Sequence, residues 1–380
     1  MQWSVFSDQF TSWLLPWLAL VSQLPFGAND KLDNFVAMLL TVGSPTLAAY
    51  SLALTVMNGR WIARRFSSYN YPNTRNAVRI LSSLQQSPLQ VSSEEYLLSS
   101  LVVLPKNNEW WTELVAWLDY TYDTWSISAA ASIIWVVIAF LFTIIDAFQE
   151  SFGGPGDLIT TKSWNGQSVG SAWLWLLPVV VGWLQISPKC DSERLDQAVS
   201  RANRIAYVAT PDGEPELAGL RAREYAISLR PGTGDLLRRD EGCTVPIFNY
   251  ARFFSWVEVV ETIAGAFRVA SERARAPLSS HPEIGWAKET INVRSRVPNR
   301  TETLVQVEEY CAIIGKSQRM RRMGWGPGVW SRMFVASVLA LSLQWGTTVA
   351  AVVVVWFAPT TGKSILADEC MCCSYRAGST

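Results

Sequence analysis

The chain has 380 residues, of which 49 % are apolar and 17 % are charged, with 32 basic residues against 32 acidic ones. This even balance gives no indication of a polyanionic partner, so we expect no binding to nucleic acid. A single histidine excludes metal motifs that need two, and the six cysteines show no disulfide framework, so we expect no metal ligands and no cofactor.

The apolar residues are grouped into long runs that alternate with polar segments. A helix of about 20 apolar residues crosses the ~30 Å hydrocarbon core of a bilayer. Tryptophan is abundant, with 19 residues, and many lie near the ends of the runs, as is typical of a membrane–water interface. The sequence therefore predicts an all-α, multi-pass membrane protein with four transmembrane helices, at residues 35–57, 127–148, 169–186 and 333–357.

The N-terminal segment, residues 1–31, contains a shorter apolar run at 11–26 that includes Pro16 and Pro25. A run of this length is more typical of an interfacial or re-entrant helix than of a span. A short extra span and a cleaved signal peptide are the alternatives, although the segment lacks a positive n-region.

The first predicted span carries Gly43 and Pro45 near its middle, and Pro178 lies inside the third span. Proline removes a backbone donor and clashes with the preceding turn, so both places predict helix kinks. A broken helix that lines a transport site is one interpretation of the first kink; a packing kink is the interpretation we favour. Asp146, at the end of the second span, is the candidate intramembrane carboxylate.

Basic residues follow the first span (Arg60, Arg64 and Arg65) and precede the fourth (Arg319, Arg321 and Arg322). We interpret them as charges that set the topology and face the lipid headgroups. All but four of the basic residues lie in segments 58–126 and 188–332. The positive-inside rule therefore predicts a membrane region at 32–187 whose loop 58–126 is cytosolic, a second cytosolic loop at 188–332, and location in the plasma membrane or an endomembrane.

The 188–332 segment has helical periodicity, and Asp191 is a suitable N-cap for its first helix. Helices at 247–274 and 303–316 each have an apolar face that needs a partner. The two faces can pack against one another, lie on the membrane surface or bind other proteins. The expected partners are therefore membrane lipids and proteins bound through these helices.

Several stretches resemble a family of uncharacterised multi-pass membrane proteins of filamentous fungi. They are PFGANDKLDN at 25–34, LTVGSPTLAAYSLALT at 40–55, TWSISAAASIIWVVIAFLFTIID at 124–146 and IFNYARFFSWVEVVE at 247–261. The resemblance covers residues 1 to about 361 and implies the fold described above, but no known activity. The cysteine-containing tail at 358–380 departs from the family pattern, which indicates a truncated or misread C-terminus.

No catalytic motif accompanies these features, so the favoured function is a non-enzymatic scaffold or interaction protein. A transporter or channel truncated at its C-terminus is the first alternative. A membrane-embedded transferase or hydrolase is the second.

Overall fold

The chain divides into two compact units, and each is described by itself. The computed structural model describes residues 10, 14–24, 31–43, 45–92, 94–119, 127–152, 174–186, 189–222, 224–229, 246–275, 303–311 and 327–357. Unit 1 comprises Met1–Leu24, Trp125–Leu184 and Val338–Thr380, and unit 2 comprises Pro25–Thr124 and Gln185–Ser337.

Unit 2 is mostly helical. Its longer helices are α3 (Lys31–Gly43), α4 (Pro45–Phe66), α5 (Thr74–Ser83), α6 (Glu95–Val103), α7 (Asn108–Leu118), α11 (Ser192–Arg204), α14 (Phe253–Arg275) and α15 (Leu304–Cys311). Shorter turns are α12 (Ala218–Arg221) and the 3-10 helices η2 (Pro105–Asn107) and η4 (Pro246–Arg252). Two short antiparallel strand pairs complete the unit. Strand β1 (Gln90–Val91) pairs with β4 (Ile227–Ser228), which lies far away in the sequence, and β2 (Tyr207–Val208) pairs with the nearby β3 (Glu216–Leu217).

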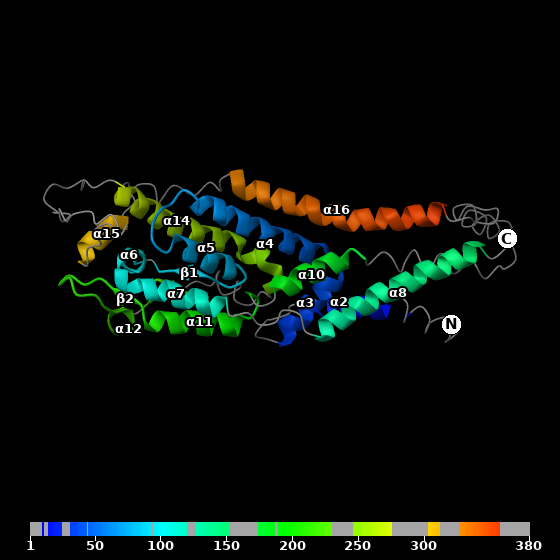
Figure 1. Ribbon diagram of the computed structural model, residues 1–380, viewed down its shortest axis with the longest axis horizontal. Helices are drawn as coiled ribbons and strands as arrows, with labels where there is room; N and C mark the ends of the chain where they lie inside the picture. The colour runs from blue at the N-terminus through cyan, green and yellow to red at the C-terminus, as the bar shows by residue number, and fades with distance from the viewer. Residues whose placement is uncertain are drawn as a thin grey trace, which may run out of the picture. The chain divides into compact units, whose positions relative to one another are not determined.

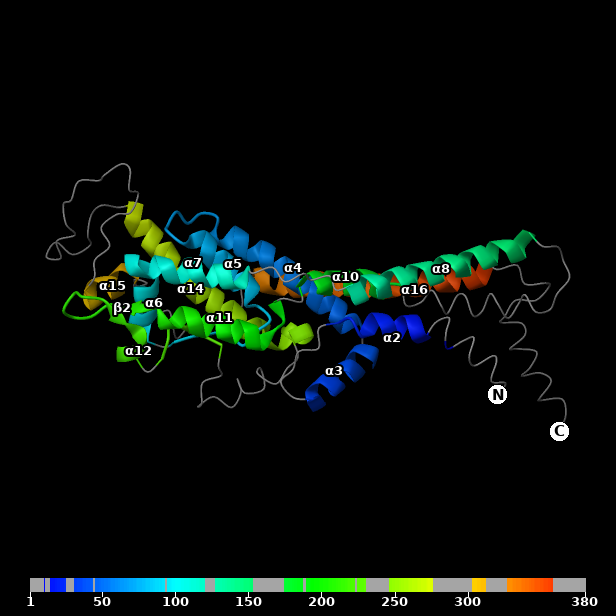
Figure 2. The ribbon, with the colours of Figure 1, turned by 60° about the horizontal axis from the view of Figure 1, so that its bottom comes forward.

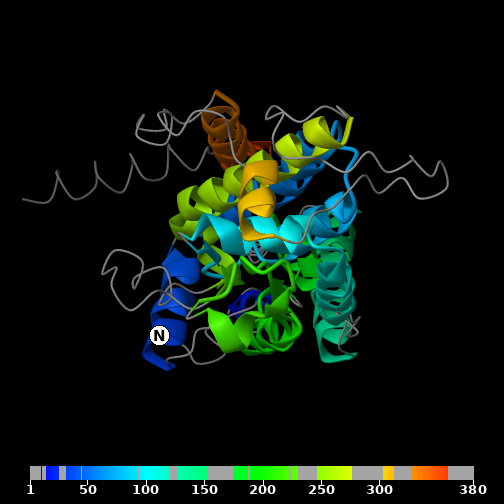
Figure 3. The same ribbon diagram turned by 90° about the vertical axis from the view of Figure 1, so that its left-hand side faces the viewer.

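The helices of unit 2 form layers around one core. Helices α4, α5 and α14 lie side by side (Figure 1), and α7 runs beside α11 (Figure 2). Helix α15 crosses α6 at one end of the unit (Figure 3). Helices such as α5, α7 and α11 are amphipathic and bury one apolar stripe against their neighbours, whereas α6 is buried at every residue from Leu97 to Val103.

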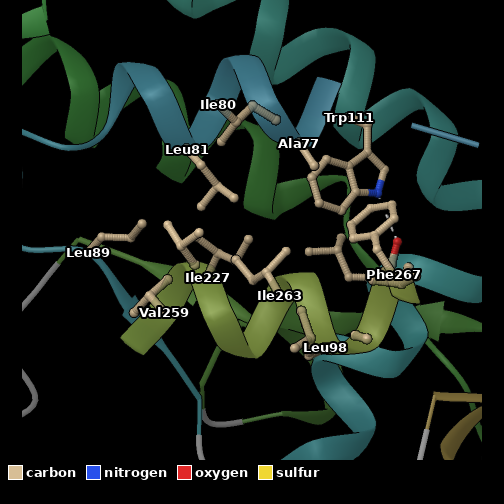
Figure 4. Packing of buried hydrophobic residues seen from close by; sticks show 14 of the residues in the cluster. Ala77, Ile80, Leu81, Leu89, Leu98, Trp111, Ile227, Val259, Ile263 and Phe267 are labelled. Atoms are coloured by element: carbon tan, nitrogen blue, oxygen red, sulfur yellow. Dashed lines mark hydrogen bonds between the residues drawn. The ribbon is translucent and has the colours of Figure 1, made fainter. Parts of the chain in front are cut away.

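Aliphatic side chains make up most of this core, and the aromatic rings of Trp111 and Phe267 pack among them (Figure 4). The ring of Phe267 on α14 lies edge-on to Trp111 at 5.5 Å between centroids, to Phe66 at 5.9 Å and to Tyr71 at 6.2 Å. Edge-to-face contacts of this kind add to the stabilisation from buried area. The indole N–H of Trp111 donates to the Leu101 carbonyl at 2.9 Å, so its burial leaves no unpaired donor.

The predicted cap of α11 is confirmed. Asp191 has extended backbone angles, and its Oδ1 accepts a hydrogen bond from the backbone N–H of Arg194 at 3.0 Å. A carboxylate there satisfies an orphan donor and interacts well with the helix dipole.

Unit 1 contains α2 (Leu15–Val21), α8 (Ile127–Phe152), most of α10 (Leu176–Ile186) and the larger part of α16 (Pro327–Phe357). Helix α2 packs against α8. Helix α2 is much shorter than the apolar run at 11–26 in which it lies.

The expected multi-pass membrane architecture is wrong: within the described residues, no helix offers a stretch both long and apolar enough to cross a membrane. The run at 35–57 is shared between two helices, α3 and α4, and α10 has only 11 residues of the expected 169–186 span.

The predicted membrane localisation is wrong for the same reason. The assignment of loops 58–126 and 188–332 to the cytosol rested on the four spans, so it loses its basis.

The two predicted kink sites are helix boundaries. Helix α3 ends at Gly43 and α4 begins at Pro45, where the missing N–H of proline costs nothing because first-turn donors have no partner within the helix. Pro178 is likewise in the first turn of α10 and is exposed to solvent.

Candidate functional site

One buried face of α4 is polar. Ser51, Thr55 and Asn58 follow one another at spacings of four and three, so they lie on the same side of the helix, and Arg65 continues the stripe two turns later. The first three are 0, 4 and 2 % exposed. We call these four residues the α4 polar face. Because burying a polar group costs free energy unless it is hydrogen-bonded, this face needs partners from neighbouring segments.

Thr55 is the centre of the first group of partners. Its hydroxyl donates to the Ser51 carbonyl at 2.8 Å and accepts from Gln86 Nε2 at 2.9 Å and from Asn249 Nδ2 at 2.7 Å. A hydroxyl has one proton and two acceptor sites, so all its capacity is used. The two amides must therefore present their NH₂ groups to Thr55, and their oxygens must point away from it.

Four buried oxygens around this centre have no hydrogen-bond partner in the described part of the protein. They are Ser51 Oγ, Gln85 Oε1, Gln86 Oε1 and Asn249 Oδ1. An unsatisfied buried acceptor costs about 1–3 kcal/mol. Ordered water is the ordinary remedy where several polar groups meet.

A buried arginine borders the Thr55 group. Arg252 of η4 is 3 % exposed, and its Nη1 donates to the Gln86 carbonyl at 3.0 Å. Burial raises the pKa of the nearby Cys190 thiol to about 12, although the positive charges of Arg252 and Lys189 act in the opposite direction. Cys190 is therefore a protonated thiol at neutral pH, which is poorly nucleophilic.

A second arginine, Arg332 of α16, meets the α4 polar face at Asn58. Its Nη1 donates to Asn58 Oδ1 at 2.5 Å, and its Nε donates to the Gly328 carbonyl at 3.0 Å. The guanidinium lies 3.9 Å from the centroid of the Trp61 ring, a close cation–π contact. Its remaining nitrogen, Nη2, is buried and has no hydrogen-bond partner within the described ranges of the chain.

Arg65 ends the α4 polar face in an ion pair with Glu261 of α14. Arg65 Nη2 lies 2.9 Å from Glu261 Oε2, and Arg65 Nε lies 3.2 Å from Oε1. The hydrogen bond to Glu261 raises the pKa of Arg65, against the opposing effect of burial. Both side chains are about one-third exposed, so water weakens the pair.

Of the candidate residues from the sequence, only Arg65 belongs to this network. Arg60 and Arg64 are exposed on α4. Arg319, Arg321 and Arg322 lie outside the described residues. For Gly43, Pro45 and Asp146 the structure describes only the helix to which each belongs.

The residues that sequence reasoning missed are Thr55, Gln85, Gln86, Asn249 and Arg332. One signal was present: three polar residues at spacings of four and three inside an otherwise apolar run indicate a helix face with polar contacts. The glutamines and Asn249 carry no such signal, because only the tertiary fold brings them to Thr55.

The fold and the site together define a mostly helical protein of two units with a buried polar network. Comparison with protein-family models, curated proteins and solved structures gives no match to the chain. The resemblance to a fungal membrane family therefore stays a prediction. In the described part of the chain, no group of three His, Cys, Asp or Glu side chains is placed to hold a metal ion.

Proposed function

We propose that this chain is a non-enzymatic interaction protein that binds a partner protein through exposed apolar helix surfaces. The observation that carries the proposal is the surface of α3. Most of its described side chains are large, apolar and exposed, from 40 % to 71 %: Leu32, Phe35, Val36, Met38, Leu39 and Leu40.

A patch of this kind differs from scattered apolar exposure. Single exposed apolar residues are normal on protein surfaces, as Leu220 on α12 illustrates at 83 % exposed. Six on one short helix expose several hundred Å² of apolar surface, a size at which patches mark binding sites. Among the described side chains of α3, only that of Ala37 is buried. The described side chains of α3 therefore contribute little to the core of unit 2.

The helices first predicted to bind partners bury much of their described apolar surface inside unit 2. Within 247–274, the apolar face of α14 is buried in the core through Trp256, Val260, Ile263 and Phe267. Within 303–316, Val307, Tyr310 and Cys311 of α15 are buried. This arrangement supports a role for α14 and α15 as framework and for α3 as the contact surface.

The transport and enzymatic alternatives remain untested predictions. No observation on the described residues favours either of them over binding.

Site-specific photocrosslinking in the native cells tests the proposal. A photoreactive side chain at position 35 or 39 of the full-length chain should yield the same discrete protein adduct. The same group at position 220, which is more exposed but isolated, should not yield it. The proposal is wrong if positions 35 and 39 give no protein adduct, or if position 220 gives the same adducts in equal amount.

A further inference from the structure

Arg332 is a buried positive charge for which the described residues provide no ion-pair partner. It is 7 % exposed. The three salt bridges formed among the described residues are Arg65–Glu261, Arg79–Asp119 and Arg221–Glu216, and none includes it. A buried charge without a counterion costs several kcal/mol, so such an arginine calls for a negatively charged partner.

Glu261 is the carboxylate whose charge acts on Arg332, but it already forms an ion pair with Arg65. Glu261 acts on Arg332 at long range, but its two oxygens accept hydrogen bonds from Arg65 between 2.9 and 3.3 Å. Burial lowers the pKa of Arg332 to about 10, and the charge of Glu261 only partly opposes this effect. The guanidinium is therefore still charged at neutral pH, and its charge is incompletely compensated.

The guanidinium is also held in a defined orientation. Its Cζ lies 3.9 Å from the centroid of the Trp61 ring and 5.3 Å from the centroid of the Phe253 ring. Asn58 and the Gly328 carbonyl use Nη1 and Nε. Among the described residues, Nη2 has no hydrogen-bond partner and remains a buried donor. A donor held in a fixed orientation is well placed to bind an oxyanion.

The location of this donor adds a second attraction for anions. The bond from Nε to Gly328 shows that the side chain runs back along α16 toward the helix start at Pro327. First-turn N–H groups have no partner within a helix, and the dipole places partial positive charge there. A Cβ built on Gly328 meets no atom within 4 Å, so there is open space beside this turn.

We propose that Arg332 and the first turn of α16 bind a phosphate-type oxyanion, with Nη2 as the side-chain donor. The open space at Gly328 is the approach for the ligand. A phosphate group belongs to soluble phosphorylated compounds and to anionic lipid headgroups alike. The shared chemistry is what the site recognises.

Thermal unfolding of the full-length chain tests this site with inorganic phosphate as the probe and chloride at equal ionic strength as the reference. A ligand that binds only the folded state raises Tm progressively with its concentration. The wild-type chain should show this rise with phosphate. Arg332→Met, which fills a similar volume without a charge, should need at least tenfold more phosphate for the same shift.

A second pair of variants keeps the test independent of the folding of Arg332→Met. Gly328→Glu places a carboxylate one turn before Arg332, at a spacing that favours an intramolecular ion pair. It should raise Tm without phosphate and remove most of the response to phosphate. Gly328→Gln, of the same size and without a charge, fills the same space, so the difference between the two variants isolates the effect of the charge. Gly328→Gln should retain more of the phosphate response than Gly328→Glu and should not raise Tm to the same extent without phosphate.

Vesicle flotation separates the two sources of phosphate. If lipid is the source, the chain should float with vesicles of phosphatidic acid and phosphatidylcholine, not with phosphatidylcholine alone, and Arg332→Met should not float. If a soluble compound is the source, inorganic phosphate should raise Tm and neither vesicle should bind. No response to either probe, or equal responses in Arg332→Met and wild type, would overturn the proposal.

Discussion

Arg65 on α4 holds Glu261 on α14 across 196 positions of sequence, with the Arg65 Nη2 donating to Glu261 Oε2 at 2.9 Å. Arg65 Nε also contacts both carboxylate oxygens, at 3.2 and 3.3 Å. This pair joins two long helices at the end of the α4 polar face. The charge of Glu261 also acts on Arg332 and partly opposes the effect of burial on its pKa.

Replacing Glu261 with Gln should lower the free energy of unfolding by about 1–2 kcal/mol. A partly exposed multidentate pair contributes about 1 kcal/mol, and the loss of the Glu261 charge also leaves Arg332 less compensated. Urea unfolding measures the change. Glu258→Gln on an exposed position of the same helix should change stability by less than about 0.5 kcal/mol. Equal effects of the two substitutions would contradict this assignment.

Thr55→Val should lower the free energy of unfolding by about 2–4 kcal/mol. The substitution keeps the shape of the side chain but removes the oxygen that accepts from Gln86 and Asn249, so two buried NH₂ groups lose a partner. Thr262 is the matched control, because its hydroxyl bonds only the Glu258 carbonyl one turn earlier, in an exposed setting. Thr262→Val should be nearly neutral in the same urea titration, and a Thr55→Val effect no larger than this one would refute the role of Thr55.

Alkaline pH should destabilise the protein through its buried thiols. Burial raises the pKa of both Cys190 and Cys311 from 9.0 to about 12. Between these values the unfolded chain has lost the thiol protons and the native chain still holds them, so stability falls as pH rises from 9 to 12. Below pH 9 the thiols are protonated in both states, so their burial does not yet lower the free energy of unfolding.

The double variant Cys190→Ala, Cys311→Ala should lose less stability over that pH interval than the wild type. Urea midpoints measured below pH 9 and between pH 9 and 12 provide the comparison. Parallel losses in the two proteins would show that other groups cause the alkaline effect.

Phe267→Ala should lower the free energy of unfolding by about 3–5 kcal/mol, because it removes a fully buried ring that contacts Phe66, Tyr71 and Trp111 and leaves a cavity. Val305 on α15 is 65 % exposed and serves as the control. Val305→Ala should change stability by less than about 0.5 kcal/mol. A loss below about 1 kcal/mol for Phe267→Ala would contradict the central place of this ring in the core.

Helix positions could be predicted from the sequence where local signals are strong. Asp191 caps α11 as expected, and α8 begins at Ile127, where the apolar run begins. These features depend on residues within one turn of each other, which periodicity and capping rules describe well.

Local signals could not predict whether the apolar residues lie in a membrane span or in a packed core. An apolar run is compatible with a membrane span and with a packed core, and the run at 35–57 was assigned to a span. The spacing of Ser51, Thr55 and Asn58 favours a helix that meets polar partners. The partners themselves, Gln86 and Asn249, are 31 and 194 positions from Thr55, and no local pattern indicates that they meet.

The site at Arg332 could not be predicted either, because its surroundings come from distant segments of the chain. A basic residue before a long apolar run is typical of a topogenic charge, and its sequence neighbours give no hint of burial. Its burial results from Trp61, Asn58 and Phe253, which belong to other segments of the chain.

The most direct test of the proposed interaction role is the size of the native assembly that contains this chain, measured by gel filtration of extracts from its own cells. Leu39→Glu places a charge at the centre of the exposed α3 surface, and Leu220→Glu places the same charge at an isolated exposed position. We predict that the wild type and Leu220→Glu elute together in an assembly larger than one chain, and that Leu39→Glu elutes as the free chain. Elution of all three proteins at the same position would contradict binding through α3.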